Sequence, residues 1–231
     1  MQKIVLIVAG GSGSRMQTEI PKQFLPIAQK PILMHTIEAF YRYDRCLKII
    51  LVLPENYVNF WKKLCEKYQF NALHQIVIGG ATRVLSVKNG IEAIKTTEEA
   101  VVAIHDSVRP FVSTAIIKQN FEMAQKLGSA VTCIPLKDSI RMLKENGQSE
   151  ALDRTQFRLV QTPQTFWLSV LRKAYQQSDI QHLTDDASVV QKIGFPIHLV
   201  EGNPQNIKIT TPEDLWIAET LCQKLNLTQT L

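Results

Sequence analysis

The chain has 231 residues, of which 45% are hydrophobic and 20% are charged, and its formal net charge at pH 7 is +5. This length suits one large domain or two small ones and allows a substantial core. The positive charge suits an anionic partner, but no long run of lysine and arginine exists, which argues against nucleic acid and favours small phosphates.

Two further classes are excluded by the apolar segments and the cysteines. The N-terminal MQKIVLIVAGG has six apolar residues in succession before its glycines, too few for a signal peptide, and no apolar run approaches membrane-spanning length. The four cysteines lie far apart without a CxxC pair, which argues against a zinc site or a disulfide framework and favours reduced, mostly buried thiols. We therefore expect a cytoplasmic protein that binds no membrane.

Apolar strand patterns and amphipathic helical patterns alternate through the first part of the chain. Strands are expected at 4–8, 48–53, 75–78, 101–104 and 129–134. Helices are expected at 31–43, 56–68, 84–94 and 113–127. Pro31 suits a first helical position, and Ser113 and Gly128 suit the two ends of the last helix. This alternation predicts an α/β fold with a mostly parallel, doubly wound (Rossmann-like) sheet.

The pattern changes after residue 135. Two short, mixed segments at 139–143 and 149–152 flank Asn146-Gly147, a strong hairpin-turn signal. Because they hold too few apolar residues for a packed domain, we interpret 136–160 as a projecting β-arm, which usually seeks a partner chain. The core pattern resumes at Phe166, with a late strand at 197–200 and a closing helix at 211–225.

The loop at 9–24, which follows the first strand, has the composition of a phosphate-binding loop. Its glycines let backbone amides approach phosphates, and Arg15 and Lys22 add the fixed cations that a triphosphate needs. The loop is neither a Walker A motif nor a dinucleotide fingerprint, because no GK[ST] follows and Met16 replaces the third glycine. A solvated loop with incidental charges is the alternative.

Other polar residues follow later strands, and parallel sheets bind ligands beyond the carboxyl ends of their strands. Asp106, at the end of the fourth strand, could hold ribose hydroxyls or Mg²⁺, or could merely pair with Arg109 or cap a helix. Asp185 and Asp186 suit metal binding, acid–base work or a helix N-terminus. We favour the helix cap for both, which leaves the hydroxyl of Thr184 for a ligand.

The histidines and tryptophans give no sign of a functional site. The five histidines have no metal-ligand spacing, and His35, in an apolar helix, suits packing better than catalysis. The three tryptophans suit core or helix-face anchors rather than a base-stacking ladder, which also argues against an RNA-binding module.

Six segments together resemble the 2-C-methyl-D-erythritol 4-phosphate cytidylyltransferases of the non-mevalonate isoprenoid pathway. They are AGGSGSRM with PKQF, GGATRVLSVKNG, HDSVRP, QTPQTF, TDDAS and VEGNPQNIKITTPEDL. Their order and spacing match the family over nearly the whole length, which makes the resemblance highly specific. It implies one nucleotidyltransferase domain over 1–231, with the arm at 136–160 clasping a second subunit.

The resemblance also implies roles for particular residues. Arg15 and Lys22 resemble the pair that stabilises the transition state, and Arg154 and Lys208 the pair that positions the sugar phosphate. Further contacts to the sugar phosphate would come from Asp106, Arg109, Thr162 and Thr184. Contacts to CTP would come from Ala9, Gly10, Gly11, Gly13, Gly79, Gly80, Ser86 and Asp106. Mg²⁺ would be held mainly by the CTP phosphates, with Asp106 as the candidate protein ligand.

The implied reaction suits these residue types. A phosphate attacks the α-phosphorus of CTP, and because this nucleophile is already anionic it calls for cations and backbone amides rather than a base. Ribitol-5-phosphate cytidylyltransferases are the nearest alternative, since they share PKQFLP, HDSVRPF and QTPQ, but TDDAS and LDRTQFRLV favour methylerythritol phosphate. A non-catalytic nucleotide sensor is a second alternative, and the four cations named above argue against it. Ala81 stands where some relatives have an acidic residue, so only a backbone contact is expected there.

Overall fold

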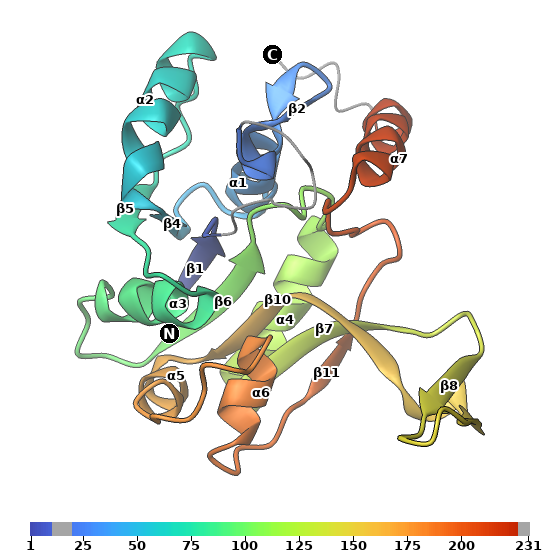
Figure 1. Cartoon of the computed structure of the whole chain (residues 1–231). Helices are drawn as coiled ribbons and strands as arrows, with labels where there is room; N and C mark the ends of the chain where they lie inside the picture. The colour runs from blue at the N-terminus through green and yellow to red at the C-terminus, as the bar shows by residue number, and fades with distance from the viewer. Residues whose placement is uncertain (11–19, 226–231) are drawn as a thin grey trace.

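The structure is a computed structural model that describes residues 1–10 and 20–225 (Figure 1). Within these residues, seven strands form one sheet in the order β11-β7-β10-β6-β1-β4-β5. The strands are β1 (Gln2–Val8), β4 (Lys48–Leu53), β5 (Gln75–Ile78), β6 (Ala100–Asp106), β7 (Ser129–Pro135), β10 (Arg158–Trp167) and β11 (Leu199–Glu201). β10 pairs antiparallel with β6 and β7, whereas the other neighbours pair in parallel. The prediction of a mostly parallel α/β sheet is confirmed.

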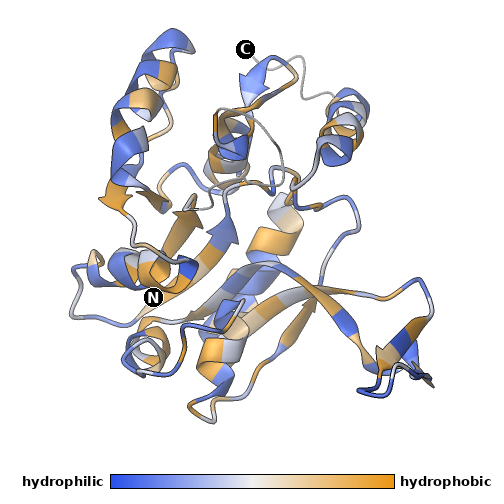
Figure 2. Ribbon diagram, viewed as in Figure 1, coloured by the Kyte–Doolittle hydropathy of each residue, from blue (hydrophilic) through white to orange (hydrophobic). Residues whose placement is uncertain are grey.

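Helices cover both faces of this sheet. One face carries α3 (Arg83–Glu92), α5 (Leu168–Ala174) and α6 (Asp186–Gln191), and the other carries α1 (Ile32–Tyr43), α2 (Val58–Lys67) and α4 (Thr114–Leu127). Since both faces are covered, the central parallel strands β1, β4 and β6 are mostly apolar (Figure 2). In β1, Ile4 and Leu6 pack on one face, and Val5 and Ile7 on the other. No helix in the described part of the chain is long and apolar enough to cross a membrane.

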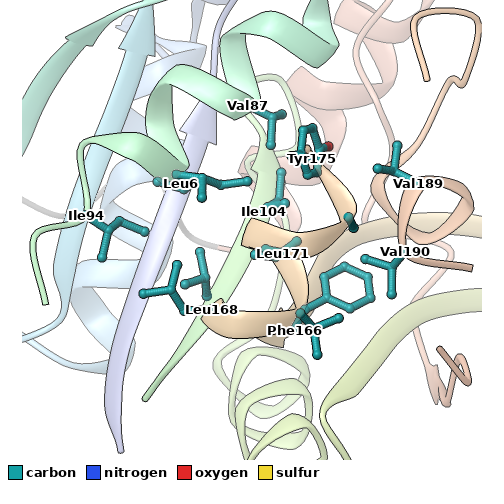
Figure 3. Packing of buried hydrophobic residues seen from close by; sticks show 14 of the residues in the cluster. Leu6, Val87, Ile94, Ile104, Phe166, Leu168, Leu171, Tyr175, Val189 and Val190 are labelled. Atoms are coloured by element: carbon teal, nitrogen blue, oxygen red, sulfur yellow. The ribbon is translucent and has the colours of Figure 1, made fainter. Parts of the chain in front are cut away.

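The hydrophobic core on the α3 side of the sheet holds α3 and α5 against the central strands. Leu6, Ile104 and Phe166 from three neighbouring strands are fully buried there (Figure 3). They pack in one cluster with Val87 of α3 and Leu171 of α5. This packing ties α3 to the centre of the sheet, so the loop before α3 has a firm support.

A third, smaller cluster attaches α7 (Pro212–Lys224) to the short strand pair of β2 (Pro26–Ile27) and β3 (Lys30–Pro31). Thr211 and Asp214 form a capping box at the start of α7, which confirms the predicted closing helix. The expectation that all three tryptophans are anchors was wrong for Trp216, because its position on α7 leaves it 74% exposed.

Element bounds agree closely with the sequence prediction except around β10. The predicted helix at 56–68 begins with a 3-10 turn, η3 (Glu55–Tyr57), before α2. Gly128 ends α4 with φ at +82°, and a Cβ there would lie 2.6 Å from Cζ of Phe195, so the position requires glycine. The expectation that the core resumes at Phe166 was wrong, since β10 is already buried from Gln161 onward.

The arm is a hairpin of β8 (Ile140–Leu143) and β9 (Ser149–Leu152), followed by the 3-10 turn η4 (Arg154–Gln156). Figure 1 shows the hairpin projecting away from the main sheet beyond β7 and β10. Leu143 is 81% exposed on the hairpin, and Leu159 is 52% exposed on the adjoining end of β10. The arm therefore presents apolar side chains to solvent in this single chain.

Candidate active site

Two neighbouring cavities open at the carboxyl edge of the parallel strands, with volumes of about 170 Å³ and 360 Å³. The residues that border the first include Gly10, Lys22 and Gln23, and those that border the second include Arg109, Thr162 and Thr184. Arg83, Asp106 and Lys208 border both cavities and form what we call the shared wall. Charged residues thus lie where two ligands would meet.

Asp106 is the anionic centre of this wall. Its Oδ2 accepts from Nζ of Lys208 at 3.1 Å and from Nε of Arg109 at 3.2 Å. Burial by itself would raise the pKa of Asp106, but the charges of Lys208, Arg83 and Arg109 outweigh it and hold the pKa well below its usual range. Asp106 is therefore a carboxylate at neutral pH, surrounded by an excess of positive charge.

Thr162 and His105 fix the backbone that carries Asp106. The backbone N–H of Asp106 donates to Oγ1 of Thr162 at 3.1 Å. Burial lowers the pKa of His105 to about 4, so its ring is neutral, and Nε2 donates to the carbonyl of Arg109 at 3.0 Å. Nδ1 is then the acceptor for the hydroxyl of Thr162, at 3.1 Å. The side chain of Thr162 is thus engaged within the protein, although the residue borders the second cavity.

The Gly79-Gly80 turn packs tightly against α3. The N–H of Gly80 donates to Oγ of Ser86 at 3.1 Å, and that hydroxyl donates to the carbonyl of Gly80 at 3.2 Å. A Cβ on Gly80 would lie 2.4 Å from Cβ of Leu85, so no side chain fits. Ser86 is fully buried and holds the turn in place. Its predicted contact with a nucleotide stays a prediction.

Asp185 and Asp186 have different functions, which corrects the expectation that both only cap a helix. Asp185 is the N-cap of α6, and its Oδ1 accepts from the N–H of Ser188 at 3.2 Å. Asp186 is fully buried and accepts from Nη1 and Nη2 of Arg83 at 3.0 and 2.5 Å. Asp186 therefore anchors a residue of the shared wall. Thr184 is exposed and borders the second cavity, and its predicted ligand contact stays a prediction.

Comparison with known proteins identifies the family. The family model IspD, described as 2-C-methyl-D-erythritol 4-phosphate cytidylyltransferase, matches residues 3–224. The chain belongs to this family. It is 48% identical over 221 residues to the cytidylyltransferase of that name from Bacteroides thetaiotaomicron, and 50% identical over 221 residues to that from Phocaeicola vulgatus. Both alignments cover 96% of this chain and 100% of the relative.

Solved structures of the IspD family share the fold. The crystal structure of 2-C-methyl-D-erythritol 4-phosphate cytidylyltransferase from Thermus thermophilus is similar with a TM-score of 0.78 and 34% identity, over 96% of this chain and 100% of that one. The 4-diphosphocytidyl-2C-methyl-D-erythritol synthase from Anaerococcus prevotii is similar with a TM-score of 0.83 and 27% identity, over 96% of each chain. The mostly parallel sheet described above is thus the fold of the IspD family.

The structure brings together most of the residues to which the IspD resemblance gives a role. Those at or beside the two cavities are Ala9, Gly10, Lys22, Asp106, Arg109, Thr162, Thr184 and Lys208. Gly79, Gly80 and Ser86 border neither cavity, but their turn lies next to Gly10, because a Cβ on Gly10 would lie 3.0 Å from Oγ of Ser86. Arg154 also borders neither cavity; it lies in η4 at the base of the arm and donates to the carbonyl of Lys137. Arg15, Gly11 and Gly13 lie outside the described residues.

The side chains suit a divalent ion that arrives with phosphates. In residues 1–10 and 20–225, no group of three or more His, Cys, Asp or Glu side chains could hold a metal ion. The carboxylate of Asp106 is already paired with Lys208 and Arg109. A Mg²⁺ ion at this edge would therefore take most of its oxygen ligands from a bound triphosphate.

A larger cavity, of about 1060 Å³, lies elsewhere, between α3, the loop after it and α5. This loop leads into the amino end of β6, the wrong edge for a ligand of a parallel sheet. The guanidinium of Arg172, which borders it, donates to the carbonyl of Ile94 at 2.9 Å. Position and chemistry both favour the two smaller cavities as the active site.

Proposed function

We propose that this chain transfers the cytidylyl group of CTP to 2-C-methyl-D-erythritol 4-phosphate and releases pyrophosphate, a step of non-mevalonate isoprenoid precursor synthesis. The observation that carries the proposal is the shared wall, where Asp106 and Lys208 separate two cavities of a size for a triphosphate end and a small sugar phosphate. Full-length relatives at 48–50% identity bear the name of this activity.

In this proposal CTP binds on the side of the glycine-rich loop. Gly10 at the first cavity, and the Gly79-Gly80 turn beside Gly10, offer backbone without a side chain, which lets a nucleotide approach closely. Lys22 borders the same cavity, and with Arg15 it would neutralise the charge that builds up on the phosphates. Ala9 and Ser86 complete the proposed nucleotide contacts.

The sugar phosphate binds in the second cavity. Lys208 and Arg109 would face its phosphate. The carboxylate of Asp106 would accept from its hydroxyl groups, and the hydroxyl of Thr184 would donate to them or accept from them. An oxygen of this phosphate attacks the α-phosphorus directly, so the site needs positioning and positive charge rather than a base. The lowered pKa values of His105 and Asp106 agree with this, because neither group titrates near pH 7.

We include Mg²⁺ as the cofactor, held mainly by the phosphates of CTP, with Asp106 as the candidate protein ligand. When bound, it neutralises part of the triphosphate charge. We also propose a cytoplasmic location, which the four free cysteines support, because unpaired thiols are typical of reducing compartments.

We further propose a homodimer in which the arm of each subunit reaches its partner, with no nucleic-acid or membrane partner. The exposed apolar side chains of the arm, such as Leu143 and Leu159, support an interface there. Arg154 would then act on the sugar phosphate in the partner's active site, which agrees with its absence from the cavities of its own chain.

The test is pyrophosphate release from CTP and Mg²⁺, with 2-C-methyl-D-erythritol 4-phosphate and ribitol 5-phosphate compared side by side. We expect release with the first acceptor and little with the second. Faster turnover of ribitol phosphate would replace the proposed acceptor, and no release with either would remove the enzymatic proposal in favour of a nucleotide sensor.

A further inference from the structure

Arg83 is a member of the shared wall, and the family resemblance drawn from the sequence implies no role for it. It stands at the start of α3, directly after the N-cap Thr82, and its side chain is 28% exposed. It borders both cavities. It is also the second of the positive charges that lower the pKa of Asp106, so it lies within electrostatic reach of the centre of the site.

The guanidinium of Arg83 is held in position by the buried carboxylate of Asp186. Nη1 and Nη2 donate to the two carboxylate oxygens of Asp186, at 3.0 and 2.5 Å. Oδ1 of Asp186 also accepts from the hydroxyl of Tyr175, a residue that is only 2% exposed. The ring of Tyr175 lies in the core with Val87 and Val189 (Figure 3). These contacts hold the guanidinium in one place before any ligand binds.

This arrangement leaves donors for a ligand. A guanidinium has five N–H groups, and the forked contact with Asp186 takes two of them. The others remain on a side chain that borders the two cavities. A guanidinium that is held in place by Asp186 and has unused N–H donors at a cavity wall suits a phosphate whose negative charge increases during the reaction.

We propose that Arg83 is a further catalytic residue, which donates to the phosphate oxygens that meet at the shared wall, and that Asp186 and Tyr175 are its positioning residues. The inference rests on the proposed function. In that reaction an acceptor oxygen bonds to the α-phosphorus of CTP while the bond to the bridging oxygen breaks, and pyrophosphate leaves with that electron pair. Arg83 would stabilise the negative charge that gathers on these oxygens.

A purely structural ion pair explains the observations less well. A buried pair gains little or nothing over apolar side chains of similar volume, since desolvation offsets the attraction between the charges. Here the carboxylate is fully buried, whereas the side chain of Arg83 is partly exposed and the residue borders both cavities. A pair whose only task is packing has no need to bring its cation to the wall of a ligand site.

The experiment is steady-state kinetics of the full chain with CTP, Mg²⁺ and 2-C-methyl-D-erythritol 4-phosphate. Arg83→Lys keeps a positive charge beside Asp186 but loses the fork, so we expect kcat to fall on the order of 100-fold, with smaller changes in KM. Tyr175→Phe keeps the ring and loses one hydrogen bond, so we expect a fall of about 10-fold. The double variant should fall no further than Arg83→Lys alone, because Tyr175 acts through Arg83.

Arg172→Lys is the matched control. Like Arg83, Arg172 donates to a fixed oxygen, here the carbonyl of Ile94, and borders a cavity, but the distant one. This variant should keep the kcat of the wild type. Thermal unfolding of each variant separates lost activity from lost folding. A native-like Arg83→Lys with unchanged kcat, an effect confined to KM, or a full further fall in the double variant would each overturn the inference. An inert wild type would overturn the proposed function as well.

Discussion

At the scale of single residues, two consecutive residues at the end of β6, His105 and Asp106, have different charge states because their surroundings differ. Burial lowers the pKa of His105 to about 4, which keeps the ring neutral. One residue on, burial of Asp106 opposes ionisation, but Lys208 and two arginines reverse the result. The pair therefore gives the site a fixed anion and a neutral hydrogen-bonding ring at physiological pH. Both serve geometry and charge rather than proton transfer.

The pKa of His105 gives a prediction for stability. Because it is lower in the folded chain than the unfolded value of about 6.5, the unfolded chain binds more protons at acidic pH, and the free energy of unfolding falls as pH falls toward 4. We expect His105 to account for a loss of about 2 kcal/mol between pH 7 and pH 5. Urea unfolding of wild type and His105→Gln at both pH values measures it.

His182→Gln changes an exposed histidine and serves as the control for the substitution itself. His35 and His74 also have lowered pKa values, so part of the dependence should remain in His105→Gln. An identical loss of stability in His105→Gln and wild type would show that the buried ring of His105 does not titrate as described.

Residues whose function depends on distant partners were the hardest to predict from the sequence. Asp106 and Lys22 were predicted as site residues from their positions at a strand end and in the glycine-rich loop, which the neighbouring sequence alone reveals. Arg83 was not, since its partner Asp186 is 103 residues away along the chain. Thr162 was predicted to contact a ligand, and its hydrogen bonds to Asp106 and His105 depend on a strand pairing that the sequence pattern does not reveal.

At the scale of elements, hydropathy predicts the parallel strands and fails for β10. Strands such as β4 are apolar from their second residue onward because both faces are buried, and the pattern is visible in the sequence. β10 passes through the centre of the sheet with Gln161, Thr162, Gln164 and Thr165 buried. Gln161, Thr162 and Gln164 are possible there because they hydrogen-bond to Asn203, His105 and Ala187, a property that a hydropathy pattern cannot show. The buried hydroxyl of Thr165 has no partner among the described residues.

The arm leads to a prediction at the same scale. Leu159 is 52% exposed next to the hairpin, and we propose that a partner subunit covers it. Leu159→Glu should shift the chain toward monomers, because a carboxylate would have to be desolvated in the interface. Leu73→Glu is the matched control, since Leu73 is 79% exposed but distant from the arm. Sedimentation velocity over a range of concentrations measures both, and equal association of the two variants would contradict an arm-mediated dimer.

At the scale of the whole molecule, the active site described here is incomplete within one chain if Arg154 acts on the substrate. Lys22 borders the first cavity, whereas Arg154 stands at the base of the projecting arm. Two-fold symmetry would bring each arm base to the other subunit's sheet. Each site would then combine Lys22 from one subunit with Arg154 from the other.

Mixing two inactive variants tests this arrangement. Lys22→Ala and Arg154→Ala should each lose most activity, since each removes a cation from the phosphates. After subunit exchange, one of the two sites in every heterodimer receives both intact residues, so we expect activity to return. If the mixture stays inactive while heterodimers are confirmed independently, Arg154 acts within its own chain or not at all.

The most direct measurement for the whole account is ³¹P NMR of the purified chain with CTP, Mg²⁺ and 2-C-methyl-D-erythritol 4-phosphate. We expect the phosphate monoester signal of the acceptor to disappear as a pair of coupled diphosphate signals and an equal amount of pyrophosphate appear, because the acceptor phosphate becomes bonded to the α-phosphorus of CTP. An unchanged monoester signal, with CTP either intact or hydrolysed to CMP, would contradict cytidylyl transfer by this site.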